Sequence, residues 1–307
     1  MVPFLRALAG FVLSLAVLAG CAPPRAGNCD LVLLAQAPLR PHQQLLAVPV
    51  GINGQWATLI VDTGAERTTL TEDAVERLGL ARDPRYVTRS GGVGGVTMNA
   101  DVKVDDFVLG GTRLPVERLA VSRFGAGLQA DGLLGADILL AFDLDIDVPG
   151  GKLSLYRVRR CPVANPPWDE PAVPVAAVAA RKDRLLVPFT LDGAPGMALL
   201  DTGAQATAIG VDMARRMGLA LQPQGSDPVV RIRGVGSATM TARLHLFREL
   251  RIGPAAWRNI RLPILPEDVG IGDALVGQDF LRDRRVWISF PTRQMFVSRL
   301  AHEVPRP

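Results

Sequence analysis

The chain has 307 residues, of which 48% are hydrophobic and 21% charged, so it is long enough to form one large domain or two medium-sized ones. Its formal net charge is +4, and its many arginines are scattered and mostly offset by acids, which excludes a continuous basic surface for a nucleic-acid partner. The 31 glycines and 24 prolines favour short strands and turns over long helices.

Residues 1–20 have the layout of a secretory signal peptide. Arg6 precedes the apolar run A-L-A-G-F-V-L-S-L-A-V, and L-A-G-C then ends at Cys21. These last four residues resemble the bacterial lipobox, whose cysteine becomes the lipidated first residue of the mature protein. We expect a lipid anchor on Cys21 and a tether over 21–44. Because Ala22 follows the cysteine, we also expect a periplasm-facing lipoprotein of the outer membrane. A plain signal peptide or a short membrane anchor is the alternative.

The first predicted folded element is a β-hairpin that ends in an aspartate, and the chain contains it twice. Residues 48–65 read V-P-V-G-I-N-G-Q-W-A-T-L-I-V-D-T-G-A. Residues 187–204 read V-P-F-T-L-D-G-A-P-G-M-A-L-L-D-T-G-A and align with them without a gap. Asn53-Gly54 falls on Asp192-Gly193, and both dipeptides are strong hairpin-turn signals between apolar runs. In each copy, therefore, the aspartate follows a hairpin.

Three further blocks follow each hairpin in the same order: a short helix that ends at a glycine, a glycine loop, and an apolar segment that contains a glycine. The first copies are T-E-D-A-V-E-R-L-G-L (71–80), G-G-V-G-G-V-T-M (91–98) and D-G-L-L-G-A-D-I-L (131–139). The second copies are G-V-D-M-A-R-R-M-G-L (210–219), R-G-V-G-S-A-T-M (233–240) and D-A-L-V-G-Q-D-F-L (273–281). Four matching blocks in one order indicate a tandem duplication.

The segment between the copies, residues 161–183, is rich in proline and alanine, which predicts a linker with an extended edge segment. The duplicated units then occupy residues 45–160 and 184–300, and residues 301–307 form a tail.

Two further cysteines, Cys29 and Cys161, lie before the first unit and after its last predicted strand. Export would place them in an oxidising compartment, so we expect a disulfide that joins the start of this unit to its end. Two buried free thiols are the alternative.

Other catalytic signatures are absent from the sequence. It contains no H-E-x-x-H and no serine in G-x-S-x-G, so we expect neither a metal, nor a cofactor, nor a serine triad. The acidic segment D-L-D-I-D (143–147) alternates like a strand, which predicts a solvated strand face, with a calcium site as the alternative.

The duplicated aspartate predicts a site with pseudo-twofold symmetry in which Asp62 and Asp201 face each other. Two carboxylates at close range do not both ionise, so they share one proton. One can act as a base on a water between them while the other donates to a substrate carbonyl. This chemistry supports peptide-bond hydrolysis without a metal or a covalent intermediate.

These motifs resemble the aspartic protease superfamily, for which proton sharing between two aspartates is an established pattern. The D-T-G sequences at 62–64 and 201–203 are each followed by an apolar-apolar-glycine, at 133–135 and 275–277. The resemblance is to the retropepsin-like branch, and specifically to bacterial exported members that carry both copies in one chain.

The resemblance implies a mainly β, two-lobed acid protease fold with pseudo-twofold symmetry, short helices after each D-T-G and a substrate cleft between the lobes. It also implies an aspartic endopeptidase that acts on extended polypeptide segments in the bacterial cell envelope, as a monomer with one intramolecular site. Three alternatives stay open: a catalytically inactive peptide-binding protein, a scaffold lipoprotein on the same fold, and a site formed between two paired chains.

Residues around the two aspartates have expected supporting roles. Gly64 and Gly203 would let the backbone turn tightly behind each carboxylate and leave N–H groups to hold it. Thr63 and Thr202 carry hydroxyl groups that can bond the backbone across the pseudo-twofold axis.

Ala65 and Ala204 follow the D-T-G sequences, where pepsins usually have serine or threonine. Without a hydroxyl group to favour the carboxylate anion, the pair should keep its proton to higher pH. By family resemblance we expect an optimum less acidic than that of pepsin, at about pH 5–6.

The glycine loops are implied to be flaps that close over the substrate. Their positions are Gly92, Val93, Gly94 and Gly95 in the first unit and Gly234, Val235, Gly236 and Ser237 in the second. Glycines between apparent strands can adopt positive φ at a hairpin tip, although ordinary tight turns are the alternative.

Overall fold

The computed structural model describes residues 30–92, 95–124, 128–159, 165–175, 179–181, 184–225, 228–233, 239–290 and 292–298. The signal peptide, Cys21, Cys29, Cys161 and the tail 301–307 lie outside these ranges, so the lipid anchor and the disulfide stay predictions. Six of the expected flap residues also lie outside these ranges: Val93, Gly94, Gly234, Val235, Gly236 and Ser237.

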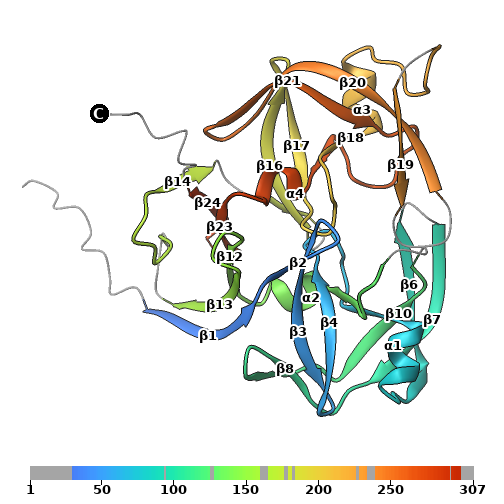
Figure 1. Ribbon diagram of the computed structural model, residues 1–307, viewed down its shortest axis with the longest axis vertical. Coiled ribbons are helices and arrows are strands. Elements are labelled where there is room, and N and C mark those ends of the chain that lie inside the picture. Colours follow the sequence, from blue (N-terminus) through green and yellow to red (C-terminus); the bar gives the residue numbers. More distant parts are fainter. Residues whose placement is uncertain are drawn as a thin grey trace, which may run out of the picture.

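Each copy of the repeat forms a lobe built mainly of β-strands (Figure 1). The N-terminal lobe consists of β2 (Arg40–His42), β3 (Leu45–Ile52), β4 (Gln55–Val61), β5 (Thr69–Thr71), α1 (Glu72–Arg77), β6 (Arg82–Gly92), β7 (Gly95–Lys103), β8 (Phe107–Leu109), β9 (Thr112–Leu114), β10 (Arg118–Ser122), β11 (Gly132–Leu134) and α2 (Ala136–Leu139). The C-terminal lobe consists of β15 (Ala179–Arg181), β16 (Arg184–Leu191), β17 (Ala194–Leu200), β18 (Ala208–Ile209), α3 (Val211–Arg216), β19 (Val229–Arg233), β20 (Thr239–Ile252), β21 (Ala255–Ile264), β22 (Ala274–Val276) and α4 (Gln278–Leu281). The mainly β, two-lobed fold that the resemblance implies is therefore confirmed, with α1 and α3 as the short helices.

The local turn signals operate as expected in both copies. Asn53-Gly54 joins β3 to β4 with φ of 48° and 79°, and Asp192-Gly193 joins β16 to β17 with φ of 50° and 87°. Positive φ at both central residues is the two-residue hairpin geometry that Asn-Gly and Asp-Gly favour. Gly79 and Gly218 follow α1 and α3 with φ of 61° and 69°, a conformation in which glycine ends a helix without strain.

A third sheet joins the two lobes, and it includes residues that were expected to belong to the tether. Its order is β1-β13-β12-β23-β24-β14, where β1 is Asp30–Pro38, β12 Asp143–Asp147, β13 Lys152–Arg159, β14 Ala172–Val175, β23 Arg285–Ser289 and β24 Gln294–Ser298. The tether was expected to reach residue 44, but residues 30–42 form β1 and β2, and β1 pairs along β13. Burial of Ala35, Ala37 and Leu39 explains why this segment is ordered.

The acidic strand β12 lies inside this sheet, so the expected solvated strand face was wrong. It pairs with β13 on one side and with β23 of the C-terminal half on the other. Asp143 and Asp145 are each only 1% exposed. Asp145 is paired: Arg285 donates to its two oxygens at 2.9 and 2.6 Å, and Trp168 Nε1 donates at 3.2 Å. The charge is thus buried with a bidentate partner.

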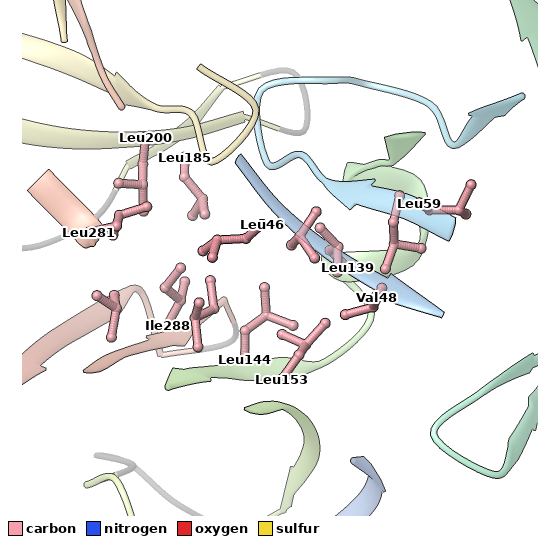
Figure 2. Packing of buried hydrophobic residues seen from close by; sticks show 14 of the residues in the cluster. Leu46, Val48, Leu59, Leu139, Leu144, Leu153, Leu185, Leu200, Leu281 and Ile288 are labelled. Carbon is pink, nitrogen blue, oxygen red and sulfur yellow. The ribbon is translucent and has the colours of Figure 1, made fainter. Parts of the chain in front are cut away.

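One hydrophobic core runs through both lobes and the joining sheet. Figure 2 shows Val48 and Leu59 of the N-terminal lobe at one end of this core, Leu200 of the C-terminal lobe at the other, and Leu144 of the joining sheet between them. The aspartates are held at the ends of strands whose inner residues belong to this core. Within the described ranges, no helix is long and apolar enough to cross a membrane.

Candidate active site

Asp62 and Asp201 come directly after β4 and β17, at the point where the two lobes meet. The backbone N–H of Asp62 donates to the Leu134 carbonyl at 2.9 Å, and that of Asp201 donates to the Val276 carbonyl at 2.9 Å. Each aspartate therefore extends a parallel strand pairing by one hydrogen bond. Their carboxyl groups meet and are hydrogen-bonded to each other, as the duplicated motif predicts.

Backbone N–H groups hold each carboxyl group in place. Gly64 and Ala65 donate to Asp62 Oδ1 at 2.9 and 2.8 Å, and Gly203 donates to Asp201 Oδ1 at 2.9 Å. This part of the expected role of the glycines is confirmed.

The physical reason for glycine at these positions differs from the expected tight turn. Neither Gly64 nor Gly203 has a positive φ. Instead, a Cβ built on Gly64 would lie 2.5 Å from Cγ of Asp201, and one built on Gly203 would overlap the carboxyl group of Asp62. Each glycine makes room for the aspartate of the opposite lobe.

The two threonines form a symmetric set of hydrogen bonds between the lobes. Thr63 Oγ1 donates to the Leu200 carbonyl and Thr202 Oγ1 to the Val61 carbonyl, each at 2.6 Å. In return, the Thr63 N–H donates to Thr202 Oγ1 at 3.0 Å and the Thr202 N–H to Thr63 Oγ1 at 3.2 Å. Both threonines are almost fully buried. These four bonds fix the position of one D-T-G relative to the other.

Burial raises the pKa of both carboxyl groups. For Asp201 the pKa lies well above its ordinary value, because burial and the charge of Asp62 both disfavour ionisation. For Asp62, burial raises the pKa, and the N–H groups of Ala65 and Gly64 offset part of this effect. The pair therefore retains a shared proton at a pH where a free aspartate is ionised.

A second pair of repeated residues supports the site and was missed from the sequence. Thr68 donates to Asp137 through its N–H and its hydroxyl group, at 2.8 and 2.7 Å, and accepts from the Gly135 N–H at 2.9 Å. Thr207 and Asp279 make the same contacts at 2.9 and 2.7 Å in the other lobe. These bonds tie the loop after each D-T-G to the apolar-apolar-glycine segment. The signal was present, because both residues recur at corresponding places in the two copies.

The glycine loop of the N-terminal lobe is the end of a hairpin. Strands β6 and β7 pair up to Gly92 and Gly95, and Gly95 has a φ of 111°, as expected for a glycine at a hairpin tip. Figure 1 shows this hairpin and β19 of the other lobe on the same side of the molecule.

Each of the two repeats matches a family model of aspartyl proteases. Residues 48–138 match the family model described as "Aspartyl protease", and residues 187–283 match "gag-polyprotein putative aspartyl protease".

Two curated relatives match about a third of the chain. The UBA domain-containing protein Mud1 of Schizosaccharomyces pombe is 32% identical over 114 residues, which are 36% of this chain and 33% of that protein. DNA damage-inducible protein 1 of Phaeosphaeria nodorum is 29% identical over 106 residues, or 34% of this chain and 23% of that protein. The chain thus spans a third or less of the length of these relatives.

A solved structure supports the fold of nearly the whole chain. The aspartic proteinase from Irpex lacteus superposes with a TM-score of 0.54 over 88% of this chain and 98% of that one, at 15% sequence identity. Each lobe of this chain thus matches a family model of aspartyl protease domains, and the two together have the fold of the aspartic proteinase.

Proposed function

We propose that the protein is an aspartic endopeptidase that hydrolyses peptide bonds in extended polypeptide segments through a water activated by Asp62 and Asp201. The observation that carries this proposal is the hydrogen-bonded carboxyl pair at the lobe boundary, in which burial raises the pKa of both members. A structural role alone does not require two intact D-T-G sequences that make the same contacts.

The mechanism follows from the shared proton. The ionised carboxylate accepts a proton from the water while the water oxygen attacks the scissile carbonyl carbon. At the same time the protonated carboxyl group donates its proton to the carbonyl oxygen. The C–N bond of the tetrahedral intermediate then breaks, the amine nitrogen takes up the proton that the first carboxyl group accepted, and the hydroxyl proton returns to the second. The N–H donors of Gly64, Ala65 and Gly203 keep the carboxyl groups oriented throughout.

We further propose that the enzyme acts in the bacterial cell envelope, as a periplasm-facing lipoprotein anchored in the outer membrane through Cys21. The support is the L-A-G-C sequence after an apolar run and the alanine that follows it. Because Thr63 and Thr202 complete one site within a single chain, the active form is a monomer.

The test uses the mature chain with a denatured protein as substrate. Asp62→Asn and Asp201→Asn should each reduce kcat/KM by about 1,000-fold or more, while thermal melting shows that the fold is retained. Asp212→Asn, on the exposed face of α3, is the matched control and should cleave like the wild type. Cleavage that persists in either D-T-G variant contradicts the proposal. Peptide binding without cleavage by the wild type would instead indicate a binding or scaffold protein.

A further inference from the structure

The two ends of the site differ in charge although the lobes are copies of each other. The gapless alignment of the hairpins, continued by a few residues, places Leu45 opposite Arg184 and Glu66 opposite Gln205. One end of the pseudo-twofold site therefore carries a charged pair where the other carries a neutral one.

A small apolar cluster lies beside Asp62, and the C-terminal lobe has a corresponding one around Ala208, Met240 and Leu265. Strand alternation places Ile60 on the same side of β4 as Asp62, because Leu59 and Val61 point into the main core. Ile60 pairs with Ala47 on β3 and with Leu133 on β11. Leu45, Phe124 and Leu128 pack against this cluster.

In the C-terminal lobe, Arg184 replaces Leu45 at the start of the equivalent strand. Its Nη2 lies 3.3 Å from Glu66 Oε1 of the other lobe, and its Nη1 donates to the Gly270 carbonyl at 2.7 Å. The charge of Arg184 also lowers the pKa of Asp62, so this side chain lies within electrostatic range of the aspartate pair. The Arg184–Glu66 pair thus bridges the two lobes next to the site.

The loops that follow β10 and β21 add to the difference in charge between the two ends of the site. Residues 265–272 read L-P-E-D-V-G-I-G and contain the exposed Glu267 and Asp268. The corresponding residues 123–130 read R-F-G-A-G-L-Q-A and contain Arg123 and no acid. Gly270 links this loop to the pair, because its N–H donates to Asp268 at 2.7 Å while its carbonyl accepts from Arg184.

At the equivalent place on the other side, the contact between the lobes is uncharged. Gln205 Nε2 donates to the Gln43 carbonyl at 3.2 Å. The two contacts that are related by the pseudo-twofold axis therefore differ: one is ionic and the other is neutral.

We propose that the Arg184–Glu66 pair makes one end of the substrate cleft an anionic subsite that takes a basic substrate side chain, whereas the Leu45–Gln205 end takes a neutral or apolar one. A peptide would then bind in a single direction. The inference rests on the proposed function, because it assigns the specificity of that same cleft.

The sign of the preference follows from the contacts. Arg184 already has Glu66 and Gly270 as partners and is 29% exposed, whereas the Glu66 side chain is 57% exposed. Glu66 is therefore the more accessible member of the pair, and the exposed Glu267 and Asp268 lie on the loop that Arg184 contacts. A lysine or arginine of the substrate can form a charge-assisted hydrogen bond with Glu66, and for a partly exposed pair this favours the basic residue by about 3- to 10-fold.

The repeat supplies matched variants. In wild-type digests of a peptide library, lysine and arginine should be enriched on one side of the scissile bond only. Glu66→Gln with Arg184→Leu copies the opposite end and should abolish this enrichment. Leu45→Arg with Gln205→Glu copies the charged pair without the acids of residues 265–272, and should create a second but weaker enrichment on the other side. If Glu66→Gln with Arg184→Leu does not fold, Glu66→Gln alone removes the same carboxylate and should also abolish the enrichment.

Several results would overturn the inference: equal enrichment on both sides in the wild type, no enrichment, a preference for acidic residues, or an unchanged profile in Glu66→Gln with Arg184→Leu.

A binding measurement separates this inference from the proposed function. The probe is a fluorescent lysine-containing peptide, compared with its glutamine analogue on the Asp201→Asn variant. Tighter binding of the lysine peptide that weakens with salt and is lost on Glu66→Gln supports the subsite even if the wild type cleaves nothing. Cleavage without a charge preference overturns the subsite and leaves the enzyme proposal standing. Absence of both cleavage and peptide binding overturns both.

Discussion

Gly64 of the N-terminal lobe lies against the carboxyl group of Asp201 of the C-terminal lobe, so closely that a Cβ on Gly64 would be 2.5 Å from Asp201 Cγ. The site therefore depends on glycine in one lobe for the position of the aspartate in the other. Gly64→Ala should displace Asp201 and lower kcat/KM by about 100-fold, because small misplacements of reacting groups have effects of that size.

The same argument applies to Gly203→Ala, which would displace Asp62. We expect similar losses in the two variants when kcat/KM is measured alongside thermal melting and circular dichroism. Full activity in Gly64→Ala would mean that the backbone relaxes to accommodate the methyl group, and that close approach is not the reason for glycine.

The threonine bonds between the lobes should contribute directly to stability. Thr63→Val keeps the shape of the side chain but leaves the Leu200 carbonyl and the Thr202 N–H without their partner in a buried place. Two unsatisfied buried groups should lower the free energy of unfolding by about 2–4 kcal/mol, measured by urea denaturation. Thr63→Ser retains the hydroxyl group and is the matched control. If the valine and serine variants unfold at the same urea concentration, the hydrogen bonds do not have this role.

The features that could be predicted from the sequence are those encoded by short sequence signals that occur in both copies of the repeat. The Asn53-Gly54 turn, the Gly79 helix end and the paired aspartates follow from short-range signals, and repetition separates them from chance. The joining sheet was not predictable, because β1 and β12 acquire their pairing and burial from strands far away in the sequence. For this reason the acids of β12 resembled a solvated face, although Asp145 is buried against Arg285.

The alanines after the D-T-G sequences should set the alkaline limit of activity. Activity needs one proton on the pair, and burial raises the pKa of Asp201 well above its ordinary value, so the proton is retained as the pH rises. A serine hydroxyl group near each carboxylate would stabilise the anion and lower the pKa. Ala65→Ser with Ala204→Ser should therefore move the alkaline limb of the kcat/KM profile to lower pH.

The control for this experiment is the isosteric pair Ala65→Cys with Ala204→Cys, whose thiol is a much weaker hydrogen-bond donor. Its alkaline limb should stay closer to that of the wild type. An unchanged limb in the serine variant would show that the residue after D-T-G does not control the proton of the pair. The less acidic optimum remains a prediction until this profile is measured.

Asp143 should make the fold less stable as the pH rises through the acidic range. It is 1% exposed, and burial raises its pKa from 3.8 to about 6. Between these values the unfolded chain ionises while the native state stays protonated, so the contribution of Asp143 to stability is full below about pH 4 and is lost as the pH rises to about 6. Asp143→Asn cannot ionise and should remove the part of the decline that comes from this residue, while the part that comes from Asp62 and Asp201 remains. The difference from the wild type should be on the order of 3 kcal/mol at pH 7 in urea denaturation. Asp212→Asn, on the exposed face of α3, should leave the pH dependence unchanged. Parallel stability curves for wild type and Asp143→Asn between pH 4 and 7 would show that Asp143 is not the group responsible.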